Sequence, residues 1–571
     1  MSNNSRIVIF IKNIIVPFVL LLYPLRMVNQ GVDLTDIGYN LYNYRVFEGS
    51  KAVWFNVATY LSNVTGMLIQ KLPYADSLLG FNIYSSLIVS AISLVIYFSI
   101  RKIIPFWIVL FGEIVAISLC WCPTVILYNY LTYLFFTLGA IALYYALIKE
   151  KKVLFIVAGV LLGINVMVRV PNVVESLLIL SVWYYAILKN KKTRQVVIET
   201  LLCLSGFIIG IIVGMIPLLF QYGFDGFVNM VNSIGQVGNG AKDYSMFSMI
   251  TKPIIAYIEQ FKWIVCIMIP AIAACSLQKI SPKLKYLWVF IEVVMMVLIF
   301  KGFHGRGVYS LDFSSYGPIF NPTLIVLAIS IGVYIACMFS KKVDESQKLA
   351  LFIVLLIILI TPIGTNNYNY AIINNLFLVM PVTLFILYKF IINKNNLVLI
   401  KIPIAATVFA MSVLAITFGL KFTFLGNNIG TTRDGMVENI PCLEGMMTDK
   451  LRVSNIEEVY AYLIDNELDG MELITYGNIP AIHYYVDMEA YFRTSWIDLN
   501  SYLVDSFDED YKKVESMTKD TRPVIILSRN VFDGIGTESY TGDYKLDKII
   551  DIIENDDYIV KLQNEQFVIF Y

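Results

Sequence analysis

Apolar runs of about 20 residues, the length that an α-helix needs to cross a bilayer, recur through most of the chain. Of its 571 residues 58% are hydrophobic and 15% are charged, and the mean hydropathy is +0.69. A soluble protein cannot bury so much apolar surface, so the sequence predicts an α-helical multi-pass membrane protein. About thirteen spans are predicted, at residues 9–27, 78–100, 103–123, 125–147, 153–170, 172–188, 196–221, 257–277, 286–301, 321–339, 350–368, 372–390 and 400–420.

The charges divide the chain into two parts. Residues 421–571 contain 13 Lys and Arg against 28 Asp and Glu, whereas the rest of the chain contains 30 and 15. Opposite net charges indicate two different environments. We therefore expect a transmembrane domain at 1–420 and a soluble domain at 421–571.

The basic residues also predict the orientation. Alternate short loops hold 20 of the 30 basic residues outside the soluble part, and such loops face the cytoplasm. An odd number of spans then places the N-terminus in the cytoplasm and the C-terminal domain outside a bacterial cytoplasmic membrane. The first span lacks a small-residue cleavage site and is predicted to be a retained anchor.

The acidic C-terminal part has alternating helix and strand patterns. Helical periodicity covers 455–466 and 545–555, and β-rich runs occur at 471–478, 522–530, 558–562 and 565–571. This alternation predicts a compact α/β domain.

The first outer loop, 28–77, begins with an acidic pair in the stretch 33-DLTDIGY-39. Asp33 and Asp36, three positions apart, could share one face of a turn. Two nearby carboxylates in a partly dry site raise one pKa, which suits a general base. Alternatively, Asp36 caps the helix that begins with IGYNLYNY and Asp33 is solvated. The apolar residues of this loop are predicted to form helices lying in the membrane interface.

Several cations on the outer side are candidates for binding a phosphate. Arg169 lies near the outer end of a span that Pro171 interrupts, although an arginine at that depth can also snorkel to the interface. His304 and Arg306 lie among glycines whose amides could cradle a phosphate, unless 301–313 is an ordinary basic loop. The first outer loop contributes Arg45.

Amide side chains near the outer ends of spans suit sugar hydroxyls. Asn129, Asn366 and Asn367 lie beside tyrosines, which are also common at membrane interfaces for other reasons. Lys242 lies in a glycine-rich stretch that could move over a substrate, or could be flexible without a function.

The acidic motif DLTDIGY directly after the first span, the interfacial loop, the bundle and the C-terminal outer domain together resemble the GT-C glycosyltransferases. Many members have adjacent acidic residues, whereas Asp33 and Asp36 are three apart, so either could be the base. The resemblance implies a polyprenyl-phosphate-linked sugar donor and a cell-envelope glycan or lipid acceptor. It also implies a base that activates an acceptor hydroxyl while the lipid phosphate leaves.

Arginine binds phosphate oxygens in a bidentate way, so Arg169, Arg306 and Arg45, with His304, are expected at the donor. We expect the remaining candidates at the sugar or acceptor: Asn129, Asn366, Asn367 and Lys242.

Two other functions share this architecture. A transporter or flippase for lipid-linked glycans would need charged residues along a path through the bundle, and Glu113 and Glu292 lie deep within spans. A glycan polymerase or ligase would use the same substrates at the outer face. No cofactor is indicated, although the two carboxylates could hold a divalent cation. Membrane lipids are expected partners, and the sequence indicates no nucleic-acid partner.

Overall fold

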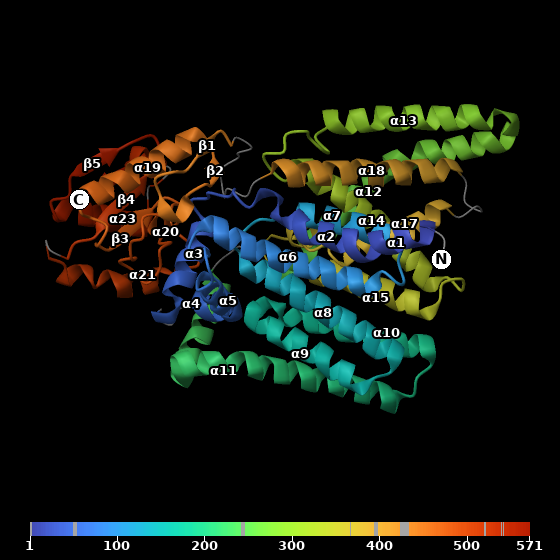
Figure 1. Cartoon of the computed structure of the whole chain (residues 1–571), viewed down its shortest axis with the longest axis horizontal. Coiled ribbons are helices and arrows are strands. Elements are labelled where there is room, and N and C mark those ends of the chain that lie inside the picture. The colour runs from blue at the N-terminus through green and yellow to red at the C-terminus, as the bar shows by residue number, and fades with distance from the viewer. Residues whose placement is uncertain are drawn as a thin grey trace.

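The computed structural model describes residues 3–49, 54–240, 246–365, 367–392, 398–422, 433–518, 521–537, 540 and 542–571. A bundle of long helices forms one part, and a smaller α/β domain lies at one end of it (Figure 1). The N-terminus lies at the opposite end of the bundle from that domain (Figure 1). The predicted fold class, a multi-pass membrane protein with a C-terminal α/β domain, is confirmed.

Within the described residues, nine helices are long and apolar enough to cross a membrane, and three shorter apolar helices accompany them. The first apolar segment is built from α1 (Asn3–Phe10), a π-helical turn (Ile11–Ile15), α2 (Val16–Leu22) and a 3-10 turn (Tyr23–Met27). The remaining helices of the bundle are α6 (Leu78–Ile100), α7 (Phe106–Leu119), α8 (Leu127–Lys149), α9 (Lys152–Val168), a 3-10 segment (Val170–Ile179), α10 (Leu180–Lys189), α11 (Thr193–Gly240), α12 (Met246–Ile280), α13 (Lys285–Gly305), α14 (Gly317–Phe339), α15 (Glu345–Ile360), α16 (Asn369–Asn374), α17 (Val379–Ile392) and α18 (Val398–Lys421).

Three predicted spans differ from the helices observed. The span predicted at 103–123 is α7, of only 14 residues, after which the chain leaves the helix. The span at 350–368 is α15, which ends at Ile360, and the span at 372–390 is divided between α16 and α17. These interruptions lie where polar residues line a cavity. Irregular backbone is tolerated at membrane depth only when protein or a cavity surrounds it. The number of thirteen spans stays a prediction.

The first outer loop is helical, with α3 (Asp36–Val46), α4 (Trp54–Ala58) and α5 (Tyr60–Gln70). Most of α3 is buried, including Ile37, Leu41 and Tyr44. Its apolar residues therefore belong to a protein core, and the helix does not simply rest on lipid as an interfacial helix would.

The C-terminal domain contains a four-stranded sheet in the order β3-β4-β6-β5. Strands β3 (Leu473–Tyr476) and β4 (Val524–Ser528) are parallel, and β6 (Phe567–Phe570) is antiparallel to β4 and to β5 (Val560–Gln563). A two-stranded ribbon joins β1 (Gly435–Met436) to β2 (Met447–Thr448). The helices are α19 (Lys450–Asp465), α20 (Ile482–Tyr485), α21 (Val504–Tyr511), α22 (Arg529–Gly534) and α23 (Tyr544–Asn555). The helices and strands predicted for this part are thus confirmed.

The C-terminal domain and the first outer loop share one hydrophobic core. Ile37 and Leu41 of α3 are fully buried in the same cluster as Val459 of α19 and Ile482 of α20. A side chain at Gly38 would overlap Ala481, since a Cβ there would lie 2.2 Å from the Ala481 Cβ. The backbone of the domain and that of the loop therefore touch, and the two parts form a single unit around α3.

Candidate functional site

The two carboxylates of the acidic motif have different surroundings. Asp33 is fully buried, and its Oδ1 accepts hydrogen bonds from the backbone N–H of Thr35 (3.1 Å) and from Thr35 Oγ1 (2.8 Å). Its Oδ2 accepts from the N–H of Ile37 (2.9 Å), in the first turn of α3. Asp33 therefore takes the capping role from two residues before the N-cap position, Thr35, by accepting from an N–H in the first turn of α3. The alternative in which Asp36 is the cap and Asp33 is solvated is wrong.

Asp36 begins α3 and is only half-buried. Its carboxyl group has no hydrogen-bond partner within the described part of the chain. Burial, and after it the charge of Asp33, raise the pKa of Asp36 from 3.8 to about 7. Burial also raises the pKa of Asp33, against the effect of the hydrogen bonds from Ile37 and Thr35. A carboxyl group that titrates near neutral pH and has no fixed partner is suited to accepting a proton.

A divalent cation between these two carboxylates does not fit the arrangement. Both oxygens of Asp33 already accept hydrogen bonds from N–H or O–H groups of Thr35 and Ile37, so they face donors where a cation would have to sit. Across the described ranges, no group of three or more His, Cys, Asp or Glu residues is arranged to hold a metal ion.

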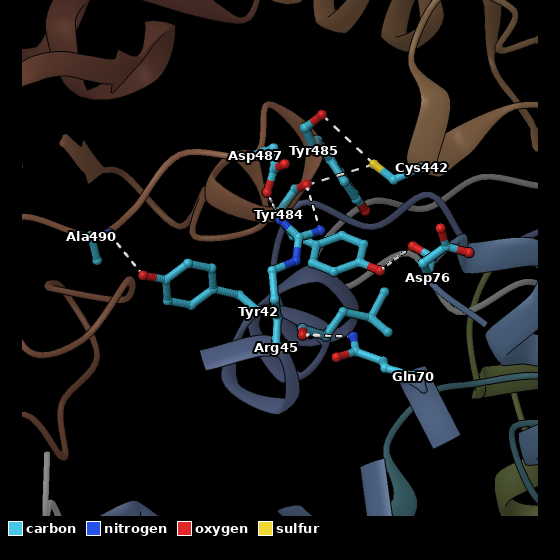
Figure 2. Close-up of polar contacts among 10 residues, drawn as sticks. Tyr42, Arg45, Gln70, Asp76, Cys442, Tyr484, Tyr485, Asp487 and Ala490 are labelled. Atoms are coloured by element: carbon cyan, nitrogen blue, oxygen red, sulfur yellow. Dashed lines mark hydrogen bonds and ion pairs between the residues drawn. The ribbon is translucent and has the colours of Figure 1, made fainter. Parts of the chain in front are cut away.

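Arg45 contacts the C-terminal domain. Its guanidinium forms an ion pair with Asp487 and lies 3.9 Å from the centroid of the Tyr484 ring (Figure 2). The Tyr484 hydroxyl in turn donates to the backbone carbonyl of Asp76 (2.6 Å). One turn earlier in α3, the Tyr42 hydroxyl accepts from the N–H of Ala490 (2.7 Å; Figure 2). These bonds hold α3 against the domain. The Arg45 guanidinium was expected at the donor phosphate, but in the structure it contacts Asp487 and Tyr484.

Arg169 lines a polar cavity of about 40 Å³ between the ends of several helices, which we call the Arg169 cavity. The arginine is the residue at which α9 ends. Its guanidinium lies 5.5 Å from the centroid of the Tyr128 ring and has no hydrogen bond to another described residue. The predicted residues Asn129 and Asn367 line the same cavity. Sequence reasoning missed further lining residues: Glu175, Asn172, Asn374 and Asn375.

Two of the missed residues, Asn172 and Glu175, belong to a buried network beside Arg169. Asn165 donates to Glu175 Oε2 (2.6 Å), and Asn172 donates to Thr132 Oγ1 (2.8 Å) and to the carbonyl of Asn165 (3.0 Å). Buried polar groups need such partners. The signal that could have found these two residues is the recurrence of a polar residue every three or four positions, at 165, 169, 172 and 175, in an otherwise apolar stretch.

Four other candidates lie away from this cavity or cannot be placed. His304 and Arg306 are exposed at the end of α13, and neither lines the Arg169 cavity. His304 Nδ1 lies 3.3 Å from the carbonyl of Tyr309. Lys242 and Asn366 lie outside the described residues.

The two glutamates predicted to lie deep within spans are not part of the Arg169 cavity. Glu113 and Glu292 are almost completely buried, and their carboxyl oxygens have no hydrogen-bond partner in the part of the chain that the structure describes. Neither residue lines the Arg169 cavity, and Asp36 does not line it either. The described acids therefore do not mark a continuous charged path through the bundle.

No family model matches the chain, and no curated protein matches it in sequence. Among solved structures, it is similar to ArnT from Cupriavidus metallidurans bound to undecaprenyl phosphate, with 8% identity and a TM-score of 0.48, over 100% of this chain and 98% of that one. It is also similar to the oligosaccharyltransferase of Archaeoglobus fulgidus in complex with zinc and sulfate, with 12% identity and a TM-score of 0.47, over 92% of this chain and 69% of that one. AglB of the same organism, in complex with an inhibitory peptide and a dolichol-phosphate, has 10% identity and a TM-score of 0.42, over 92% and 70%.

Proposed function

We propose that this chain is a membrane glycosyltransferase of the GT-C type. It moves a sugar from a polyprenyl-phosphate carrier to a cell-envelope acceptor at the outer face of a bacterial cytoplasmic membrane. The observation that carries the proposal is the difference between the two carboxyl groups of the acidic motif. Asp33 is committed to the cap of α3, whereas Asp36 has no hydrogen-bond partner among the described residues and a pKa of about 7.

In the proposed reaction, Asp36 removes the proton from an acceptor hydroxyl. The hydroxyl oxygen forms a bond to the anomeric carbon of the donor sugar, and the bond from that carbon to the phosphate oxygen breaks. The leaving lipid phosphate keeps the electron pair of the broken bond, and Arg169 stabilises its charge. The donor tail stays in the bilayer, so the reaction takes place at the membrane boundary.

The volume of the Arg169 cavity sets a condition on this reaction. A volume of about 40 Å³ accommodates about three water molecules, but no phosphosugar. Because Asp36 and Arg169 must act on one anomeric carbon, the proposal requires donor binding to widen the cavity toward α3. Spin labels on α3 and α9 should therefore report a changed distance when the lipid-linked sugar is added.

The test uses purified protein in nanodiscs and measures release of polyprenyl phosphate from a panel of polyprenyl-phosphate sugars, with cell-envelope extract as acceptor. Removing a general base slows turnover by about 10²- to 10⁴-fold, so Asp36→Asn should do so while the protein remains folded. Asp312→Asn, a change at an exposed outer aspartate, is the matched control and should leave turnover unchanged. If Asp33→Asn abolishes turnover and Asp36→Asn does not, Asp33 is the base. Full turnover in both variants would contradict the proposal.

A further inference from the structure

A second cavity, much larger than the Arg169 cavity, lies between the C-terminal domain and the start of the acidic motif. It has a volume of about 550 Å³, and Asp33 and Thr35 line one side of it. The lining also includes Gly477 and Ser528, which stand at the carboxyl ends of the parallel strands β3 and β4. We call it the strand-end cavity. In open α/β sheets, ligands bind in the crevice outside the carboxyl ends of parallel strands.

The strand-end cavity contains buried polar atoms that the protein itself does not satisfy. Arg452 is 1% exposed, and its Nη1 donates to the carbonyl of Val32 (2.8 Å). Its Nε lies 3.8 Å from Asp449 and has no hydrogen-bond partner among the described residues. Gln566 also lines the cavity, and its buried Oε1 accepts no hydrogen bond from the part of the chain that the structure describes. An unused donor and an unused acceptor in one cavity are costly unless a polar ligand or water fills it.

The charges around the cavity exclude an anionic ligand. The backbone N–H groups of Gly477 and Asn478 would suit a phosphate, but both already donate to Asp498 (3.2 and 2.7 Å). Four carboxylate side chains line the cavity, at Asp33, Asp498, Asp543 and Glu565. Of the two arginines in the lining, Arg529 forms an ion pair with Asp533 (2.7 Å), and Arg452 offsets only the charge of Asp33, so the lining keeps a net negative charge.

The remaining lining suits a hydroxyl-rich ligand. Asn478 and Asn530 are exposed amides at the cavity, and each provides both donors and an acceptor. Tyr540, which is only half-buried, adds an aromatic ring, and sugars can stack on such surfaces. Carboxylate, amide and arginine groups together can bind several hydroxyl groups of one sugar ring.

We propose that the strand-end cavity binds sugar units of an uncharged acceptor glycan. This inference rests on the proposed function and names the substrate class of the same site. Asp33 and Thr35 line the cavity, and Asp36 follows directly as the first residue of α3. A glycan held here by its internal units would present a hydroxyl beside the proposed base.

The experiment fills the cavity from its exposed side. Asn530→Trp should block it without disturbing a buried contact, and Asn555→Trp, at the far end of α23, is the control of equal size. Binding of short neutral hexose oligosaccharides and of their uronic-acid counterparts is measured by titration of the full chain in nanodiscs. Wild type and Asn555→Trp should bind a neutral oligosaccharide, and Asn530→Trp should bind it at least about tenfold more weakly, a change of about 1.4 kcal/mol.

Kinetic measurements separate this inference from the proposed function. In Asn530→Trp, KM for the acceptor should rise while KM for the lipid-linked sugar stays unchanged. Equal binding by all three proteins, preference for the acidic oligosaccharides, or no binding of a neutral oligosaccharide by wild type would each overturn the inference. Binding without any release of polyprenyl phosphate would leave the cavity assigned to a glycan and refute the transferase.

Discussion

Arg452 of the C-terminal domain donates a hydrogen bond of 2.8 Å to the carbonyl oxygen of Val32, the residue before Asp33. Its side chain is buried, and its positive charge lowers the pKa of Asp33 against the raising effect of burial. The domain satisfies a series of backbone carbonyls in this part of the loop, through Met447 to Asn29, Arg452 to Val32, Tyr485 to Asp33 and Ala481 to Leu34. The acidic motif is therefore held in place by the C-terminal domain as well as by the helix it precedes.

Replacing Arg452 should destabilise this contact. In Arg452→Met, the carbonyl of Val32 loses its donor and the buried Asp33 loses a compensating charge, so we expect a loss of about 2 kcal/mol. The apparent melting temperature of the protein in nanodiscs should fall, while Lys450→Met, at an exposed position two residues earlier, should leave it unchanged. Equal melting temperatures for the two variants would show that the Arg452 contact contributes nothing.

Replacing Arg169 should weaken binding of the lipid-linked sugar, whereas replacing Arg306 in the loop at 301–313 should not. A hydrogen bond to a charged partner contributes about 1.5–3 kcal/mol, so Arg169→Gln should raise KM for the lipid-linked sugar by about 10- to 100-fold. Arg169→Lys should recover only part of this loss, because a lysine cannot bind the phosphate in a bidentate way. Arg306→Gln is the matched control and should leave KM unchanged, since Arg306 is exposed at the end of α13. The reverse result would move the donor site to the loop at 301–313.

The pH dependence of turnover should follow Asp36. With a pKa raised to about 7, the carboxyl group is mostly protonated at pH 6, so turnover should rise with pH and be half-maximal near pH 7. Asp33→Asn removes the neighbouring negative charge and should move this rise to lower pH, while one amide oxygen still accepts from α3. A profile that does not move would show that Asp33 does not influence the base.

The same pKa has a consequence for stability. Because the pKa of Asp36 in the folded protein lies above its ordinary 3.8, folding favours the protonated carboxyl. Its contribution to stability is fully present below pH 3.8 and is lost as the pH rises to about 7. In Asp36→Asn this component should be absent, which a comparison of melting temperatures at pH 5 and pH 8 can measure.

The helices could be predicted from the sequence because apolar length and periodicity determine them locally. The limits of α6, predicted at 78–100, match Leu78–Ile100. The break at 120–126 is longer than the single residue predicted between two spans, and the break at 375–378 falls inside a predicted span. Both depend on contacts with other helices. Hydropathy averages over such short polar interruptions.

The candidate site could be predicted only where its signal is local. Polar residues near the outer ends of spans led to Arg169, Asn129 and Asn367, which line one cavity. The partner of Arg45, Asp487, lies 442 positions away, so no pattern in the loop shows that this guanidinium is engaged. Arg452 could not be predicted for the same reason, because its partner Val32 lies 420 positions away.

The sequence also could not predict which of the two aspartates bonds to the N-terminus of α3. Asp36 stands directly before an apolar helical pattern and looks like its cap. In the structure Thr35 has a non-helical backbone (φ −113°, ψ −106°), which brings the side chain of Asp33 to the N–H of Ile37. A single sequence does not reveal which of two acids three positions apart reaches the helix.

The close packing of α9 on α11 gives a last prediction, about the bundle that supports Arg169. A Cβ at Gly163 of α9 would lie 2.1 Å from the carbonyl oxygen of Phe207, and one at Gly206 of α11 would lie 2.2 Å from that of Ile156. Small residues allow transmembrane helices to approach to backbone contact. An added methyl group cannot be accommodated by side-chain movement here, so Gly163→Ala must push the helices apart.

Because α9 ends at Arg169, this separation should both destabilise the protein and disturb the cavity. We expect a cost of about 1–3 kcal/mol, seen as a lower melting temperature in nanodiscs, together with a raised KM for the lipid-linked sugar. The control is Gly332→Ala in α14, where a Cβ would meet no atom within 4 Å. That change removes a glycine from a helix interior and should be neutral or stabilising by up to about 1 kcal/mol. If the two alanine variants melt at the same temperature, the backbone contact between α9 and α11 does not hold the bundle together.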